Sequence, residues 1–199
     1  MKQIFIYKDK DDYQIWQELK NGNELSFELI FKKYYDLLFN YGLNIISDQN
    51  LVEDVIQDFF IDIWKKKEKL GDAHSIKYYL LVSYRRLLFK RISKESKINI
   101  ERIENYLDQI MVDSQEEVII RHKESADRKK TVSSNINKLS TRQREIIYLK
   151  FYKNLSYQEI SVVMEINYQS TRNLLFAAIK TLKSNLSKKD IFSDVPKIK

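Results

Sequence analysis

Hydrogen-bonding side chains crowd the start of the segment Tyr168–Lys183, and their types suit the recognition of DNA bases. An Arg side chain can bond the major-groove edge of guanine at two atoms, and Asn or Gln can do the same for adenine. The apolar residues of this segment repeat with helical spacing, so the polar ones gather on the early turns of a helix. These polar residues are Gln169, Ser170, Arg172 and Asn173.

A shorter helix is predicted directly before this one. Ser156 is a favourable N-cap and Glu159 stands in the capping-box position, an arrangement that satisfies free backbone N–H groups. The helical pattern breaks at Glu165-Ile166-Asn167, where Asn tolerates left-handed backbone geometry. Two helices around such a corner form a helix-turn-helix whose second helix reads the major groove. The alternative is an αα-hairpin whose polar residues simply face water.

A second candidate for nucleic-acid contact is a predicted helix that begins at Ser75 and interleaves aromatic with basic residues. Positive charges can follow phosphates, and aromatic rings can stack on the bases of a melted strand. The alternative is a solvated basic helix whose tyrosines lie in the core. The residues expected to pack inward include Tyr79 and Leu87, and those expected to face DNA are Lys77, Tyr78, Tyr84, Arg85, Arg86, Lys90 and Arg91.

An acidic helix, capped by Ser47 or Asp48, is predicted before this basic one. Its apolar residues occupy about half of the circumference, and the outer face carries Glu53, Asp54, Gln57 and Asp58. Such a face would be repelled by DNA. It is either an ordinary solvated surface or a docking surface for a basic partner helix.

Catalytic chemistry is not expected in this chain. It has no Cys, and His74 and His122 stand without a nucleophile–base set or a ligand cluster. We therefore predict no enzymatic activity, no metal site and no cofactor. The beginning of the chain is too charged for a signal peptide, and the longest uncharged run, Leu37–Ser47, is too short to cross a bilayer. A cytoplasmic protein is expected.

Composition predicts an all-α fold. The 199 residues include 3 Gly and 1 Pro, while helix-favouring residues dominate. Further helices are expected at Tyr13–Lys20, after a cap at Ser26, and after a cap at Ser140, where Phe151 would belong to the core stripe. The formal net charge of +7 favours an anionic partner.

The predicted helices group into two small domains joined by a flexible linker. Residues 1–95 would form the first domain and residues 135–187 the second, which contains the helix-turn-helix. Between them, residues 96–134 lose apolar density and carry crowded charges of both signs, which is typical of a linker. Residues 188–199 are expected to form a frayed tail.

Together these motifs resemble the extracytoplasmic-function (ECF) sigma factors of bacterial RNA polymerase, in particular the short two-domain type common in Bacteroidetes. The segment Phe27–Leu70 is similar to the family's second region through the spacing of Glu53, Asp54, Gln57, Phe60 and Trp64. The segment Leu139–Lys183 is similar to the family's fourth region, and its anchors are Leu139, Arg144, Leu149, Leu155, Ser156, Tyr157, Glu159, Ile160, Ile166, Ala178 and Leu182.

The resemblance implies a role for each of the three helices. The face with Glu53, Asp54, Gln57 and Asp58 would dock on a coiled coil of the largest catalytic subunit of the polymerase. The helix Lys77–Arg91 would melt and capture the −10 promoter element, with the loop Lys69–Ser75 shaping a base pocket. The contacts to the −35 element would fall on Arg172, Asn173 and Phe176, with Ser170 near the helix start. Arg86, Lys90 and Ala177 depart from the family's usual residues.

We therefore expect a factor that binds core RNA polymerase and promoter DNA and that directs promoter recognition and opening. The family suggests a membrane-linked anti-sigma factor as a further partner. The alternatives from other classes are a stand-alone helix-turn-helix regulator and a protein-interaction adaptor without specific DNA binding.

Overall fold

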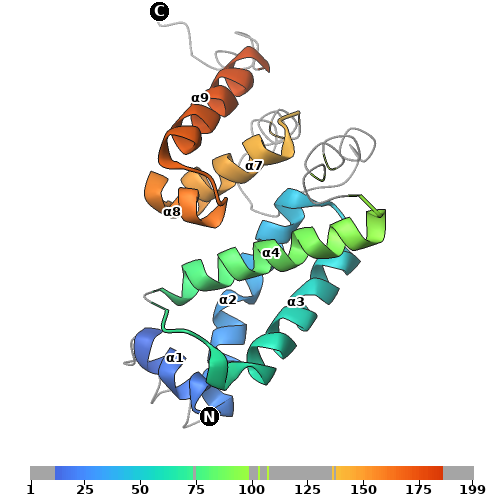
Figure 1. Ribbon diagram of the computed structural model, residues 1–199. Coiled ribbons are helices and arrows are strands. Elements are labelled where there is room, and N and C mark those ends of the chain that lie inside the picture. The colour runs from blue at the N-terminus through green and yellow to red at the C-terminus, as the bar shows by residue number, and fades with distance from the viewer. Residues whose placement is uncertain are drawn as a thin grey trace, which may run out of the picture. The chain divides into compact units, whose positions relative to one another are not determined.

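The described residues of the chain form helices and short connections. The computed structural model describes residues 12–73, 75–98 and 138–185, with the single residues Ile103, Leu107 and Ile136. Every regular element among them is a helix, so the predicted all-α fold is confirmed (Figure 1). None of these helices is long and apolar enough to cross a membrane.

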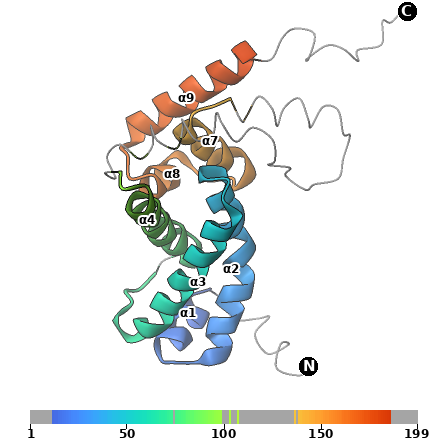
Figure 2. The same cartoon turned by 90° about the vertical axis from the view of Figure 1, so that its right-hand side faces the viewer.

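The chain divides into two compact units. One unit comprises Met1–Leu43 and Asp48–Ile98, and the other comprises Asn44–Ser47 and Asn99–Lys199. The helices of the first are α1 (Asp12–Lys20), α2 (Glu24–Ile45), α3 (Gln49–Lys65), the 3-10 turn η1 (Lys67–Lys69) and α4 (Ile76–Ser96). Helices α3 and α4 pack against each other, while α1 lies against η1 and α4 (Figures 1 and 2).

Side-chain caps set most of the helix starts. Asp48 caps α3 as predicted, because its Oδ1 accepts the N–H of Leu51 at 3.0 Å. The prediction that Ser26 caps α2 is wrong. Asn23 does so, accepting the N–H of Ser26 at 3.1 Å, and the helix therefore begins before Ser26. Ser26 is buried within the first turns and donates its hydroxyl to Glu18 at 2.6 Å.

Tyr84 fills the middle of the first unit. Its ring is fully buried and meets the rings of Tyr41 and Phe59 edge-on, with centroids 6.3 and 5.7 Å away. Gly42 makes room for it, because a Cβ at that position would lie 2.6 Å from Tyr84 Oη and 2.8 Å from Val52 Cγ1. Burial raises the pKa of the Tyr84 hydroxyl, so this group stays neutral in the core.

The second unit is built from short helices around the longer α9. The elements are α7 (Thr141–Ile147), the π-helical turn η3 (Tyr148–Tyr152), α8 (Tyr157–Val163) and α9 (Tyr168–Asn185). α7 and α8 both pack on α9 (Figure 1). The buried apolar residues come from all of these elements and include Leu139, Ile146, Leu149, Leu155, Ile160, Val163, Leu175 and Ala178.

The predicted caps of α7 and α8 are both confirmed as capping boxes. Ser140 and Gln143 exchange side-chain-to-backbone hydrogen bonds of 3.4 and 3.3 Å at the start of α7. At the start of α8, Ser156 Oγ accepts the N–H of Glu159 at 3.2 Å, and Glu159 Oε2 accepts the N–H of Ser156 at 2.6 Å.

Phe151 is an exception to the predicted core. It is 56% exposed, whereas helical spacing had assigned it to the buried stripe with Ile147. The cause is the π-helical turn, in which the N–H of Lys153 bonds to Tyr148 O, five residues back, at 3.2 Å. The wider turn changes the angular spacing of the side chains, so a 3.6-residue pattern no longer predicts which of them face inward.

Parts of the predicted organisation fall outside the described residues. This holds for most of the predicted linker 96–134, for the tail 188–199, and for His74 and His122. Within that predicted linker, Ile103 and Leu107 are described, and both are helical and buried. Ser96 still belongs to α4, one residue beyond the predicted domain end at 95.

The close approach at Gly42 gives a testable prediction. Gly42→Ala should lower the free energy of unfolding, because overpacking of ~1–3 kcal/mol exceeds the ~1 kcal/mol that Ala gains over Gly in a helix. Gly71→Ala is the matched control, since a Cβ there meets no atom within 4 Å. Urea unfolding of the full chain measures both. Adding Tyr84→Phe to Gly42→Ala should restore part of the loss, and wild-type stability of Gly42→Ala alone would contradict the close approach.

Candidate functional site

The corner between α8 and α9 is a tight C-terminal turn followed at once by a new cap. The N–H groups of Glu165 and Ile166 bond to Val162 O and Ser161 O at 3.3 and 3.1 Å. This is the Schellman pattern, which requires a left-handed residue directly after the helix cap. Glu165 is that residue, with φ at 55°, so assigning the left-handed geometry to Asn167 was wrong.

Asn167 instead caps the start of α9. Its Oδ1 accepts the N–H of Ser170 at 2.7 Å, and its carbonyl accepts the hydroxyl of Thr171 at 3.0 Å. A side-chain cap of this kind satisfies a backbone donor that the helix itself leaves unpaired. The predicted start of the helix at Tyr168 is confirmed.

α9 presents the predicted polar residues on one exposed face. Thr171, Leu175 and Ala178 are buried on its opposite side, which fixes the rotation of the helix. The outward residues Gln169, Ser170, Arg172, Asn173 and Phe176 are all exposed.

Two features of this exposed face bear on recognition. Gln169 Nε2 donates to Asn173 Oδ1 at 3.1 Å, which links two amide side chains that could each read a base edge. Phe176 is 73% exposed, although an apolar ring of this size is ordinarily covered. Polar hydrogen-bonding groups and an apolar ring therefore share one surface.

Fewer residues of α4 are exposed than the sequence predicted. Arg86 and Lys90 are exposed, and Lys77 and Tyr78 are half-buried. Tyr84 was expected to face DNA, and this expectation is wrong because its ring lies in the core.

Arg85 was also expected to face DNA, but it is only 8% exposed. Its guanidinium lies 4.3 Å from the centre of the Phe89 ring, a cation–π contact within α4. Helix α4 buries Leu81, Phe89 and Ile92 in addition to Ile76, Leu80 and Leu88. Its buried stripe is therefore wide enough to include Arg85.

A shallow hollow of about 340 Å³ lies between α3 and α4, beside the exposed cations of α4. Tyr79 and Leu87, expected in the core, are instead half-buried and line this hollow. The remaining lining residues are Phe59, Asp62, Ile63, Lys66, Leu70, Ser83, Arg86 and Lys90. An apolar and aromatic floor is thus combined with a mostly cationic rim. The spacing of residues along α4 did not predict this hollow, because the exposure of Tyr79 depends on which elements pack beside α4.

The outer face of α3 carries the predicted acidic group. Asp54, Gln57 and Asp58 are exposed, while Glu53 is half-buried and accepts a hydrogen bond of 2.8 Å from Gln49. Ile61 is 51% exposed on the same helix, three residues beyond Asp58. Ile61 was not among the residues predicted for this face, although its spacing from Gln57 and Asp58 indicates that the three share it.

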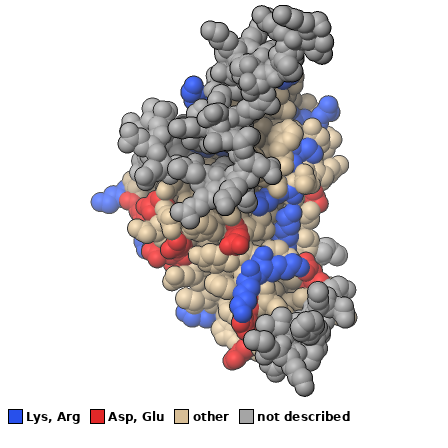
Figure 3. Space-filling model, turned by 180° about the vertical axis from the view of Figure 1, so that it is seen from behind, with Lys and Arg blue, Asp and Glu red and all other residues tan. Residues whose placement is uncertain are grey.

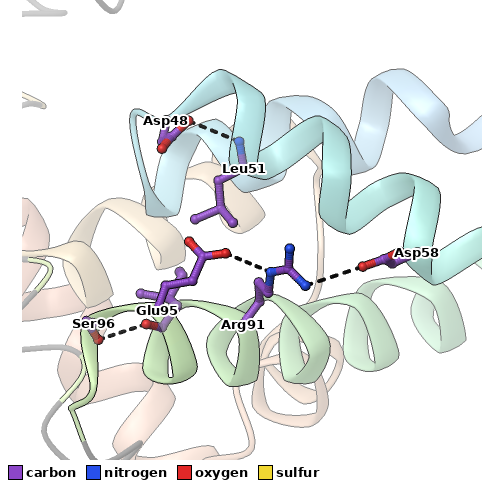
Figure 4. A network of polar contacts seen from close by, with 7 residues as sticks. Asp48, Leu51, Asp58, Arg91, Glu95 and Ser96 are labelled. Atoms are coloured by element: carbon purple, nitrogen blue, oxygen red, sulfur yellow. Dashed lines mark hydrogen bonds and ion pairs between the residues drawn. The ribbon is translucent and has the colours of Figure 1, made fainter.

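Arg91 of α4 points toward this acidic face rather than toward the hollow (Figure 4). Its Nε donates to Glu95 Oε1 at 2.7 Å, and its NH1 lies 3.6 Å from Asp58 Oδ2. The hydrogen bond to Glu95, followed by the charges of Glu95, Asp58 and Asp54, raises the pKa of Arg91. The positive charge of Arg91 therefore lies beside the acidic face of α3, although the sequence predicted that it faces DNA with the other cations of α4.

On the face drawn in Figure 3, Lys and Arg side chains lie close to Asp and Glu side chains. In the part of the chain that the structure describes, no three His, Asp or Glu side chains come together as metal ligands would. The candidate site consists of three surfaces: the exposed face of α9, the hollow with the cations of α4, and the acidic face of α3.

Comparison with known proteins connects these surfaces to one family. The family model for Sigma-70 region 2 matches residues 30–98, which include α3 and α4, and that for Sigma-70 region 4 matches residues 132–182, which include α8 and most of α9. The curated relatives include the ECF RNA polymerase sigma factor SigX of Bacillus subtilis. It is 21% identical over 169 residues, which cover 82% of this chain and 84% of SigX.

A second curated relative is also an ECF sigma factor. The ECF RNA polymerase sigma factor SigK of Mycobacterium tuberculosis is 24% identical, covering 78% of this chain and 85% of SigK.

Among solved structures, the sigma factor RpoE of Bartonella quintana, crystallised with the anti-sigma factor NepR, superposes with a TM-score of 0.59. It has 19% identity and covers 81% of this chain and 97% of RpoE. CnrH, solved in complex with the cytosolic domain of CnrY, also superposes with a TM-score of 0.59, at 16% identity over 87% of this chain and 95% of CnrH. With both sigma regions matched in order along the chain, this protein belongs to the ECF family of RNA polymerase sigma factors.

Proposed function

We propose that each of the three exposed surfaces of this sigma factor binds a different target. As a member of its family it binds core RNA polymerase and promoter DNA and directs transcription initiation. The proposal assigns −35 reading to α9, capture of the unpaired −10 strand to α4 and its hollow, and polymerase docking to α3. The observation that carries it is the exposed face of α9, where hydrogen-bonding side chains stand opposite the buried residues of the same helix.

The proposed −35 contacts are Gln169, Ser170, Arg172, Asn173 and Phe176. Arg172 is exposed and has the geometry to bond guanine at two atoms, while Asn173 and Gln169 suit adenine. The exposed ring of Phe176 suits a thymine methyl group, which is the apolar feature of the major groove. The link between Gln169 and Asn173 supports this role, because an ordered amide loses less freedom when it binds a base.

The proposed −10 surface is the hollow between α3 and α4 with its cationic rim. Arg86 and Lys90 are exposed at its edge and can neutralise phosphates of a separated strand. Tyr79 supplies an aromatic ring on which an unpaired base can stack. Lys77 and Tyr78 extend this surface toward the start of α4, whereas the burial of Tyr84 argues for a structural role.

The proposed docking face for polymerase consists of Glu53, Asp54, Gln57 and Asp58. The acidic residues favour a basic partner and repel DNA, which keeps this face separate in function from α4. The exposed side chain of Ile61 adds an apolar contact next to the charges. An apolar centre with a polar rim is the usual anatomy of a protein–protein interface.

Further proposals follow from the family. We propose that the chain has no catalytic activity of its own, that it acts in the cytoplasm, where polymerase is, and that residues 1–95 and 135–187 act as two domains joined by the linker 96–134. RpoE was solved with an anti-sigma factor, which supports the proposal that a comparable inhibitor, membrane-linked or not, regulates this protein. The Bacteroidetes-like subtype stays a prediction.

The direct test is transcription in vitro. The purified full-length protein is added to core RNA polymerase with a library of promoter fragments, and the start sites are mapped. We expect new initiation sites that share a −10 and a −35 sequence. Sequence-specific DNA binding without any polymerase would instead indicate a stand-alone helix-turn-helix regulator, and the absence of both would favour an adaptor.

Arg172→Ala should weaken recognition at one −35 position by ~1–3 kcal/mol, because a bidentate base contact is lost. The measurement is open-complex formation on promoters that vary one −35 base at a time. Arg172→Lys is the matched control: it keeps the positive charge and should lose discrimination at the same position, since Lys lacks the planar fork. A loss of equal size on every promoter sequence would indicate phosphate contact instead of base reading.

Asp54→Lys should weaken association with core polymerase, because it places a positive charge on a face proposed to meet a basic partner. Fluorescence anisotropy of labelled protein titrated with core enzyme measures the change. Asp36→Lys is the matched control, since Asp36 is exposed on α2 and the substitution changes net charge equally. If both variants lose the same affinity, net charge and not the α3 face is responsible.

A further inference from the structure

α1 holds the loop that connects η1 to α4. Trp16 is fully buried, and its Nε1 donates to the carbonyl of Gly71 at 3.0 Å. Asp72 receives two side chains of the same helix at its Oδ1, Lys20 at 2.7 Å and Gln17 at 2.9 Å. Three side chains of α1 therefore fix two consecutive residues of the loop.

Between the buried residues Leu70 and Ala73, the loop is open to solvent at this point. Gly71 and Asp72 are exposed, and a Cβ built on Gly71 would meet no atom within 4 Å. Exposed residues with few buried contacts are the ones that local opening displaces most easily, so their hydrogen bonds matter most there. The contacts from α1 are therefore a main determinant of where the backbone at residues 71 and 72 lies.

Helix α1 also contacts a residue that lines the hollow. The Trp16 ring meets the Tyr79 ring edge-on, with centroids 5.0 Å apart. Tyr79 lines the hollow, and so does Leu70, the residue directly before Gly71. Trp16 thus contacts one wall of the hollow through Tyr79 and holds a second wall through the Gly71 carbonyl.

We infer that α1 is a positioning element for base selection at the −10 strand, with Trp16 and Asp72 as the positioning residues. By fixing Leu70 and Tyr79, they set the shape of the hollow and so the base that fits best. The inference rests on the proposed function of the hollow. α1 lies before the segment 30–98 that matches Sigma-70 region 2, so that match assigns no role to it.

The test uses two variants of the full-length protein. Trp16→Phe keeps an aromatic ring in the core but removes the donor to Gly71. Asp72→Asn is at an exposed site, so it should leave the fold intact while removing the charge that holds Lys20. Because Asp72→Asn does not depend on refilling the core, it keeps the inference testable even if Trp16→Phe fails to fold.

Each variant is combined with core polymerase and a promoter set carrying all four bases at each unpaired −10 position. Open-complex yields are compared on duplex and on pre-melted templates. We expect the ratio between the best and the worst base to fall about 3- to 10-fold, because Trp16→Phe removes a hydrogen bond and Asp72→Asn weakens the contacts of the loop to Lys20 and Gln17. Preferences at the −35 positions and affinity for core enzyme should remain unchanged.

Lys33→Gln is the matched control. Lys33 forms an ion pair of 2.5 Å with Asp12 of α1, so its loss loosens α1 on α2 without touching the loop. A purely structural role for α1 would make Lys33→Gln and Asp72→Asn alike in −10 preference, and that outcome would overturn the inference. Unchanged −10 preference in both Trp16→Phe and Asp72→Asn would also overturn it, whereas a wild-type protein that directs no initiation would overturn the proposed function itself.

Discussion

The burial of Tyr84 against Tyr41 and Phe59 is the constraint on which the first unit depends. The ring fits only because Gly42 leaves the space that a side chain would occupy. A helix anchored by a fully buried ring cannot rotate about its axis without exposing that ring to water. Residues on the far side of α4 are therefore forced outward, and Arg86 and Lys90 become the cationic edge of the hollow.

The same packing separates two chemistries that stand close together in the first unit. The inner faces of α3 and α4 are buried in the core. The outer face of α3 is acidic, and that of α4 is basic. Arg91 lies at the boundary and turns toward Asp58 and Glu95 (Figure 4). This pairing shields part of the acidic face with a charge from the neighbouring helix. Since these charged groups are exposed, their pairing contributes little to stability. The pairing matters instead for the charge that each face presents to a binding partner.

The local parts of the fold were predictable from the sequence wherever the deciding interaction spans only a few residues. The capping boxes at Ser140 and Ser156 and the cap at Asp48 depend on a side chain and a backbone group within one helical turn. The exposed face of α9 was predictable for the same reason, because its apolar spacing is regular. Predictions failed where two solutions were locally possible: Asn23 rather than Ser26 as the cap of α2, and Glu165 rather than Asn167 as the left-handed residue.

The sequence by itself determined the helical class, the helix-turn-helix with its polar reading face, and the resemblance to the ECF family, because helical periodicity and caps are local properties. Only the tertiary structure decided that Tyr84 and Arg85 turn inward and that Tyr79 lines a hollow, and only it joined Trp16 to Gly71, 55 residues away. The physical reason is that burial is a property of neighbouring elements. The spacing along one helix tells which residues share a face, but not which face another helix will cover.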